Sequence, residues 1–317
     1  MTDTQNEVFK TPVNKIRLFE HGAPGSQNFK LTRKYYTEDM PDGRVKHIVQ
    51  NITDPDIVPY IPDGIGNSTD RQRIPAVLII PGGAFRRLVY NFEGEDVAKW
   101  LNSMGIAAFV LECRLPSDEH DNAEDVPLID AMRAMRVIRG RAQEFGIDEA
   151  KIGVMGFSAG GFMAALLSTV YESDVYADYK YKDEYDKLSA RPDFAVCSYP
   201  VISIDDCIEA GKRYMSEEQV LERISDSKAK ILHKYNPDKL VRPDMPPVFI
   251  CETDDDRTTL SENSVGFYMA ARKAGVSAEL HIFRTGGHGY GCGDDFAQTG
   301  EWKVLFTKWI KSIGIIS

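Results

Sequence analysis

Short, continuous apolar segments alternate with segments of helical periodicity from about residue 75 onward, and this alternation constrains the fold more than any other feature. The expected strands cover residues 75–81, 106–111, 152–155, 194–202, 247–251 and 278–283. The expected helices cover about 97–104, 128–142, 161–170, 264–274 and 302–309. Strands that lack polar alternation are typical of a sheet covered by helices on both faces. The pattern therefore predicts an α/β fold with a mostly parallel sheet and right-handed crossovers.

Two segments interrupt this alternation. Residues 174–188 are rich in Tyr, Asp and Lys, and residues 205–241 have a helical pattern with a Ser216-x-x-Gln219 capping box. The second segment is either a solvated insertion or a helical cap that shapes a pocket, because long connections in compact domains are often functional. We expect a cap at 205–241.

Composition and charge exclude several classes of protein. The 317 residues carry 38 basic and 48 acidic side chains, a net charge of −10, which disfavours nucleic acid and anionic membrane surfaces as partners. The first residues contain an acid at Asp3 and no apolar run, and no later run approaches the roughly 18 residues needed to span a bilayer. We therefore expect a cytoplasmic protein with no nucleic-acid and no membrane partner; the sequence does not indicate an oligomeric state.

Cysteine usage gives no sign of a structural cross-link or metal. The five cysteines are an odd number without regular spacing, which fits free thiols in a reducing compartment, and no Cys-x-x-Cys pair suggests zinc. We expect no cofactor and no metal.

The segment Gly156-Phe-Ser158-Ala-Gly160 directly follows one expected strand and directly precedes one expected helix. This is the context of a nucleophile elbow, in which a sharp turn presents a serine hydroxyl above the sheet. The alternative is a glycine-rich turn that packs closely or binds phosphate, but neither Gly-x-Gly-x-x-Gly spacing nor a following Gly-Lys-Ser/Thr is present. We expect Ser158 to be a nucleophile.

A serine nucleophile needs a base, and His288 is the best candidate among six histidines because it lies in the glycine-rich loop Gly286–Gly291 after a strand. His281 falls within a strand pattern, where a structural role is expected. The remaining histidines lie on polar segments and are expected at the surface: His21, His47, His120 and His233.

The base in turn needs a carboxylate, and Asp254, Asp255 and Asp256 follow the strand at 247–251. They give the chain order Ser, Asp, His that a nucleophile elbow predicts. Spacing alone does not choose among the three.

Acyl transfer also requires donors for a developing oxyanion. The segment Pro81-Gly-Gly-Ala-Phe85 can direct the N–H groups of Gly83 and Ala84 toward Ser158, with the N–H of Ala159 as the other donor. The alternative for this segment is a simple Gly-Gly turn.

Together these residues resemble the α/β-hydrolase superfamily. Further motifs are similar to bacterial esterases related to acetyl xylan esterases and carbohydrate acetylesterases: Glu93–Leu101, Gly153–Gly161, Ser189–Phe194 and Gly286–Gly289. The acid loop of that family commonly reads Asp-Asp-x-x-Val-Pro before Glu-Asn-Ser, which aligns with Asp255–Leu260 and Glu262–Ser264. The resemblance implies Asp256 as the acid, with Asp255 as the alternative; it departs at Ala84, where Gly is usual, and at Thr259-Leu260, where Val-Pro is usual.

The resemblance covers about residues 75–313 and implies an α/β-hydrolase catalytic domain at 75–317, with residues 1–74 as an amino-terminal β extension of the same domain. It also implies a serine esterase that removes short acyl groups, acetyl above all, from carbohydrate such as xylo-oligosaccharides. A serine exopeptidase of the same superfamily and a non-catalytic binding protein with this fold remain the alternatives. Glu93, Arg114 and Tyr199 could line the pocket or serve packing only.

Overall fold

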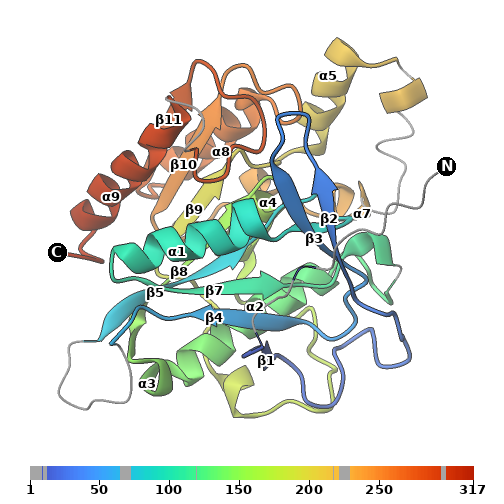
Figure 1. Ribbon diagram of the computed structural model, residues 1–317, viewed down its shortest axis with the longest axis vertical. Coiled ribbons are helices and arrows are strands. Elements are labelled where there is room, and N and C mark those ends of the chain that lie inside the picture. Colours follow the sequence, from blue (N-terminus) through green and yellow to red (C-terminus); the bar gives the residue numbers. More distant parts are fainter. Residues whose placement is uncertain are drawn as a thin grey trace.

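The computed structural model describes residues 9, 13–64, 73–118, 120–216, 218–220, 229–293 and 298–317. Its main feature is an eight-stranded sheet in the order β1-β4-β7-β5-β8-β9-β10-β11 (Figure 1). Six neighbouring strands run parallel, namely β5 (Ile74–Ile80), β7 (Ala107–Glu112), β8 (Ile147–Phe157), β9 (Ala195–Ser198), β10 (Val248–Thr253) and β11 (Ala278–Phe283). The prediction of a mostly parallel sheet is confirmed.

Two of these strands differ in length from the prediction. β8 begins at Ile147, earlier than expected. Ile147 pairs with Ile74, and a register shift separates this pairing from the rest of the strand. The polar residues around Asp148 do not have a strand pattern, so this part of β8 was not predicted. β9 ends at Ser198 although the apolar run continues to Ile202. Tyr199 has a φ of 36°, which no strand residue adopts, so the chain turns there.

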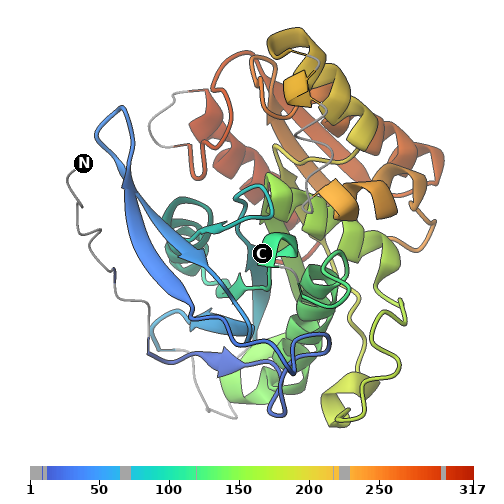
Figure 2. The ribbon, with the colours of Figure 1, turned by 90° about the vertical axis from the view of Figure 1, so that its right-hand side faces the viewer.

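Helices cover both faces of the sheet, as expected for apolar parallel strands. α1 (Asp96–Ser103) and α9 (Trp302–Ser312) lie together on one face (Figure 2). The rings of Trp100 from α1 and Trp302 from α9 are 4.9 Å apart. α2 (Val126–Gly140), α4 (Ala159–Val170) and α8 (Ser261–Lys273) lie on the other face, and a short helix, α3 (Ala142–Phe145), leads into β8. The helix predictions for these segments are confirmed to within a few residues.

The amino-terminal residues contribute strands to two sheets. β1 (Ile16–Arg17) and β4 (Asp56–Tyr60) extend the main sheet antiparallel beyond β7. β2 (Lys34–Asp39) and β3 (Val45–Gln50) form a hairpin that pairs with β6 (Leu88–Val89) in a separate three-stranded sheet (Figure 1). The boundary after residue 74 stays a prediction.

The expected cap segment contains α5 (Ile204–Tyr214), α7 (Ala229–Lys234) and a 3-10 turn at Pro237–Lys239. Ser216 and Gln219 exchange the two hydrogen bonds of the predicted capping box. Residues 217 and 221–228 lie outside the described part of the chain, so the cap itself stays a prediction. Among the described residues, no helix is long and apolar enough to cross a membrane.

Candidate active site

Ser158 lies at the turn between β8 and α4, with φ 54° and ψ −118°. Such a conformation is strained for a residue with a Cβ and is typical of functional sites. The two flanking glycines are required by close packing, since a Cβ on Gly156 would lie 1.9 Å from the carbonyl oxygen of Gly160. A Cβ on Gly160 would in turn lie 1.9 Å from the carbonyl oxygen of Ile80. The turn therefore has the geometry that a nucleophile elbow requires.

A continuous hydrogen-bond chain links the serine to a histidine and a carboxylate. Ser158 Oγ lies 2.8 Å from His288 Nε2, and His288 Nδ1 lies 2.6 Å from Asp256 Oδ2. Ser158 is 8% exposed and Asp256 is 2% exposed, so both ends of the chain are largely withdrawn from water. The structure thus brings together Ser158 and His288, which the sequence motifs predict, and Asp256, which the family resemblance implies.

Asp256 is held as an acceptor from several directions. Its Oδ1 accepts the N–H groups of Thr258 at 2.6 Å and Thr259 at 2.9 Å, and its Oδ2 accepts the Thr259 hydroxyl at 2.9 Å. Burial opposes ionisation of this carboxyl, but the bonds from His288 and from the two backbone N–H groups outweigh it and lower its pKa. Asp256 therefore carries a negative charge next to His288 at neutral pH.

The two neighbouring aspartates have other positions. Asp255 is exposed and accepts the N–H of Gly287 at 2.8 Å, which fixes the loop that carries His288. Asp254 is exposed as well. Neither occupies the place next to the imidazole, so the geometry favours Asp256 over its alternative Asp255.

Thr259, where the family pattern has Val, contacts both Asp256 and His288. Besides bonding Asp256, its hydroxyl oxygen lies 3.2 Å from His288 Nδ1 and 3.3 Å from the carbonyl oxygen of Tyr199. A valine there would have no such donor.

The loop after β5 lies directly against the nucleophile. A Cβ on Gly82 would be 2.9 Å from the Cβ of Ser158, and the following residues adopt positive φ values of 135° at Gly83 and 56° at Ala84. The N–H of Ala159 is the first of α4, where no intrahelical acceptor exists. The three expected oxyanion donors, Gly83, Ala84 and Ala159, therefore come from two segments that meet beside Ser158.

A buried carboxylate, Glu93, joins this loop to the rest of the site. Its Oε2 accepts the Gly82 N–H at 2.7 Å and its Oε1 accepts the Tyr199 hydroxyl at 2.9 Å. The Tyr199 oxygen accepts the N–H of Gly291 at 3.1 Å, and the Tyr199 ring lies edge-to-face with His288 at 5.0 Å. Glu93 and Tyr199 therefore form a brace between the loop after β5 and the loop that carries His288.

Burial raises the pKa of Glu93, while the charge of His288 and the hydrogen bonds from Tyr199 and Gly82 act in the opposite direction. From the sequence alone, Glu93 and Tyr199 could line the pocket or serve packing only. The role of Tyr199 could not be predicted from the sequence. The feature that marks it is its positive φ, and a tyrosine in the sequence does not indicate a positive φ.

Two other sequence expectations have different outcomes. Arg114, for which pocket lining and packing are both open from the sequence, is fully buried in an ion pair with Asp130 and borders a small cavity beside Gly82 and Ala159. The expectation that His120 lies at the surface is wrong, because it is 4% exposed. His120 bonds Ser26 Oγ at 3.0 Å and the Ile52 carbonyl at 3.1 Å, which satisfies both ring nitrogens within a polar-looking segment. Among the residues that the structure describes, no three His, Cys, Asp or Glu side chains gather as metal ligands.

Comparison with known proteins agrees with this geometry. The model of the BD-FAE family matches residues 65–270. The chain is 31% identical over 240 residues to an acetylxylan esterase of Xylanibacter ruminicola, covering 75% of this chain and 45% of that protein. It is 30% identical over 269 residues to endo-1,4-beta-xylanase B of Butyrivibrio fibrisolvens, covering 82% of this chain and 40% of that protein. The chain thus spans less than half the length of these two curated relatives.

Solved structures of similar shape include an acetyl ester-xyloside bifunctional hydrolase from Caldicellulosiruptor lactoaceticus, with a TM-score of 0.67 and 37% identity, covering 84% of this chain and 91% of that chain. A carboxylesterase from Lactobacillus plantarum also gives a TM-score of 0.67, at 20% identity, over 90% of this chain and 99% of that chain, and supports the fold alone. Because the family model matches more than half of the sequence, this protein belongs to the BD-FAE family, and it has the α/β-hydrolase fold that its sequence predicted.

Proposed function

We propose that this protein is a serine esterase that removes short acyl groups, acetyl above all, from carbohydrate such as xylo-oligosaccharides. The observation that carries the proposal is the unbroken chain from Ser158 Oγ through His288 to Asp256, with separations of 2.8 and 2.6 Å. A hydroxyl paired with an imidazole that a buried carboxylate orients is the arrangement of an activated nucleophile.

In the first half of the reaction, Ser158 Oγ attacks the ester carbonyl carbon and His288 Nε2 takes the hydroxyl proton. The carbonyl oxygen becomes an oxyanion, and the C–O bond to the alcohol then breaks as His288 returns the proton to the leaving oxygen. The products are a free alcohol and an acyl group on Ser158. Asp256 keeps the Nδ1 proton of His288 in place and stabilises the imidazolium that forms in between.

In the second half, His288 removes a proton from water and the resulting hydroxide adds to the acyl carbon. Collapse of this second tetrahedral state breaks the bond to Ser158 Oγ, which regains its proton from His288. In both tetrahedral states the N–H of Ala159 and that of Gly83 or Ala84 donate to the oxyanion. Glu93 and Tyr199 keep the loop that carries two of these donors at a fixed distance from His288.

The choice of acetylated carbohydrate rests on the names of similar proteins. An acetylxylan esterase and an acetyl ester-xyloside hydrolase are both more than 30% identical to this chain. The net charge of −10 disfavours polyanionic substrates and is compatible with neutral acetylated sugars.

A substrate panel tests the proposal. Acetyl, butyryl, feruloyl and long-chain aryl esters, acetylated xylo-oligosaccharides and an aminoacyl amide would be compared for the wild-type protein and the variant Ser158→Ala. We expect the highest kcat/KM on acetyl esters, release of acetate from the oligosaccharide, and loss of at least about a thousandfold in the variant. Preference for the amide would favour the exopeptidase alternative, and inactivity of the folded wild-type protein on every ester would favour a binding role.

A further inference from the structure

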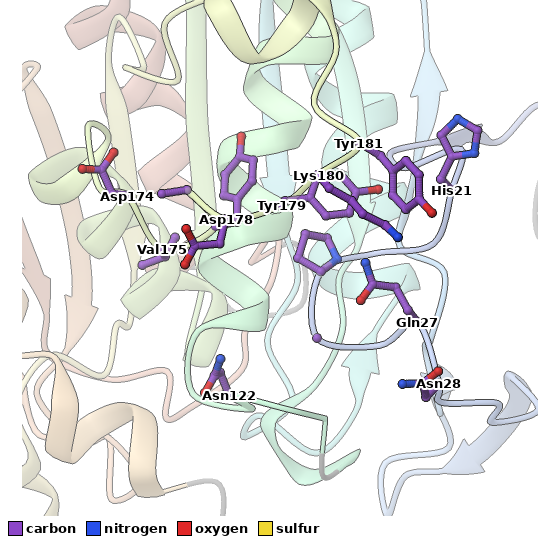
Figure 3. A pocket seen from close by; sticks show the side chains of 14 residues that line it. His21, Gln27, Asn28, Asn122, Asp174, Val175, Asp178, Tyr179, Lys180 and Tyr181 are labelled. Atoms are coloured by element: carbon purple, nitrogen blue, oxygen red, sulfur yellow. The ribbon is translucent and has the colours of Figure 1, made fainter.

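An open groove lies away from Ser158, between the segment 21–28 and the segment 174–181, with Asn122 at one end (Figure 3). Its volume is about 610 Å³, which is within the range of small-molecule and cofactor sites. Ser158 precedes the first turn of α4, whereas the second wall follows the last turn of the same helix. A helix of 12 residues separates the two places, a length of about 18 Å.

The two walls are fixed to each other by a buried arginine of α2. The Arg133 Nε donates to the carbonyl of Leu18 at 2.8 Å, and its Nη1 donates to Asp183 at 2.7 Å and pairs with Asp186 at 3.0 Å. Arg133 is 4% exposed and its partner Asp186 is largely buried, whereas the Asp183 side chain is open to solvent. Leu18 lies just before the wall at 21–28, and Asp183 lies just after the wall at 174–181. The guanidinium of Arg133 therefore links the two walls and sets their spacing.

A second cross-link lies inside the groove itself. The Tyr179 hydroxyl donates to the carbonyl of Gly22 at 2.8 Å, directly from one wall to the other. The first wall is also held from beneath, because the buried Arg114 donates to Ser26 at 2.8 Å. The groove is therefore preformed, which lowers the entropic cost of binding.

Aromatic rings follow one another from the core to the surface of the groove. The buried ring of Phe19 meets Tyr179 at 5.6 Å, Tyr179 meets Tyr181 at 5.8 Å, and Tyr181 meets His21 at 4.8 Å. Tyr181 is 41% exposed, one of the few large hydrophobic side chains that are open to solvent. Lys180 Nζ lies over the Tyr181 ring, 4.6 Å from its centroid, and His21 lies against the same ring (Figure 3). The result is an aromatic platform whose Tyr181 edge is accessible from the groove.

Uncommitted polar side chains surround this platform. The side chains of Gln27, Asn28, Asn122, Asp174 and Asp178 make no hydrogen bond to any other residue that the structure describes. Together they offer amide donors, amide acceptors and carboxylate acceptors. Figure 3 shows these side chains distributed along the groove on both sides of the tyrosines.

We propose that this groove is a second binding site for a neutral oligosaccharide, distinct from the site at Ser158. A sugar ring presents C–H groups on its faces and hydroxyls at its edge, which match an aromatic platform bordered by amides and carboxylates. Polyanions are disfavoured because Asp174 and Asp178 line the groove with only Lys180 and His21 as basic groups. The choice of xylose units as the probe rests on the proposed function. The assignment of the groove as a sugar site does not depend on that function.

The site is tested with unsubstituted xylohexaose, which contains no ester and is not a substrate. Titration calorimetry on the wild-type protein is expected to give a Kd below about 1 mM, and Tyr181→Ala is expected to weaken it at least tenfold. Tyr181→Phe keeps the ring and should bind as the wild type does. Tyr268→Ala, which removes a tyrosine on α8, serves as the matched control and should also bind normally.

Hydrolysis of a small aryl acetate is measured in the same variants and is expected to be unchanged, since the substrate does not reach the groove. The proposal is overturned if the wild-type protein does not bind xylohexaose, or if Tyr181→Ala binds it unchanged. Self-association of the wild-type protein that Tyr181→Ala abolishes, without sugar binding, would assign the groove to a second copy and also overturn it. Sugar binding without ester hydrolysis would leave the groove in place and refute the proposed function.

Discussion

Replacing Glu93 by Gln changes one oxygen to an amide nitrogen and keeps the size of the side chain. Glu93 now accepts two donors, the Gly82 N–H at 2.7 Å and the Tyr199 hydroxyl at 2.9 Å. A glutamine has one acceptor oxygen, so one donor loses its acceptor and the other bonds a neutral group. The brace between the loop after β5 and the His288 loop is therefore weakened.

The magnitude follows from the two bonds. Two hydrogen bonds to a charged acceptor contribute roughly 3–6 kcal/mol and one to a neutral acceptor roughly 0.5–1.5, so the pair loses roughly 1.5–5.5 kcal/mol. We take about 2 kcal/mol, near the lower end, as the part that acts on the oxyanion donors. The oxyanion donors act only in the transition state, so we expect this loss mainly in kcat. At about 1.4 kcal/mol per factor of ten, kcat falls about 30-fold, while KM changes by less than about threefold.

The assay is steady-state hydrolysis of an aryl acetate, with thermal unfolding measured on the same preparations. Burial raises the pKa of Glu93, so removing its charge relieves part of the burial penalty and offsets part of the lost hydrogen bonding. We therefore expect the melting temperature to fall less than in the control variant. Asp193→Asn is the matched control, since Asp193 accepts the N–H of Ile152 at 2.9 Å far from Ser158, toward the start of β8. It should lower stability and leave kcat within about twofold of the wild type.

The reasoning about the brace is refuted if Glu93→Gln keeps kcat within twofold of the wild type. It is also refuted if the melting temperature of Glu93→Gln falls as far as that of Asp193→Asn, since the loss of kcat could then follow from a general loss of structure.

Three further predictions concern residues around the site and the interior. His120→Gln should flatten the pH dependence of stability. Burial lowers the pKa of His120 from 6.5 to about 4, so unfolding takes up a proton and the wild type loses roughly 2 kcal/mol between pH 7.5 and 4.5. Urea unfolding at these two pH values measures the loss, and equal losses in both proteins would contradict it. Thr259→Val should reduce kcat about five- to tenfold, because it removes the hydroxyl that bonds Asp256. Thr259→Ser keeps a hydroxyl and should have nearly the wild-type kcat. A fully active valine variant would exclude a role of the Thr259 hydroxyl in positioning Asp256. Gly160→Ala should lower the melting temperature or prevent folding, because its Cβ would lie 1.9 Å from the Ile80 carbonyl oxygen. In the control Gly266→Ala, on α8, the Cβ meets nothing within 4 Å, and the free energy of unfolding should rise by about 0.5–1 kcal/mol. Similar melting temperatures for the two variants would contradict the packing argument.

The apolar strands of the parallel sheet were predictable because each is buried on both faces and reads as a continuous run. β1–β4 and β6 were not located from sequence, since their short or half-polar segments resemble loops; the burial of β2, for example, never exceeds an intermediate level. The end of β9 was missed because only the backbone turn at Tyr199 separates it from the apolar residues that follow.

At the site, Ser158 and His288 were recognisable because glycines and element boundaries mark them locally. The choice of Asp256 came from resemblance, and its physical reason, the bonds from Thr258 and Thr259, depends on the folded loop. The hydrogen-bond partners of Glu93 are 11 and 106 residues away in the sequence. A local sequence pattern therefore could not predict these contacts.

The central claim is that Ser158 forms a covalent acyl intermediate during ester hydrolysis. Mass spectrometry of protein quenched with acid during turnover of an aryl acetate tests it most directly. We predict that the wild-type protein carries one acetyl group, that peptide mapping assigns it to Ser158, and that Ser158→Ala carries none. An acetyl group on another residue, or steady ester hydrolysis by the folded Ser158→Ala variant at the wild-type rate, would contradict the account.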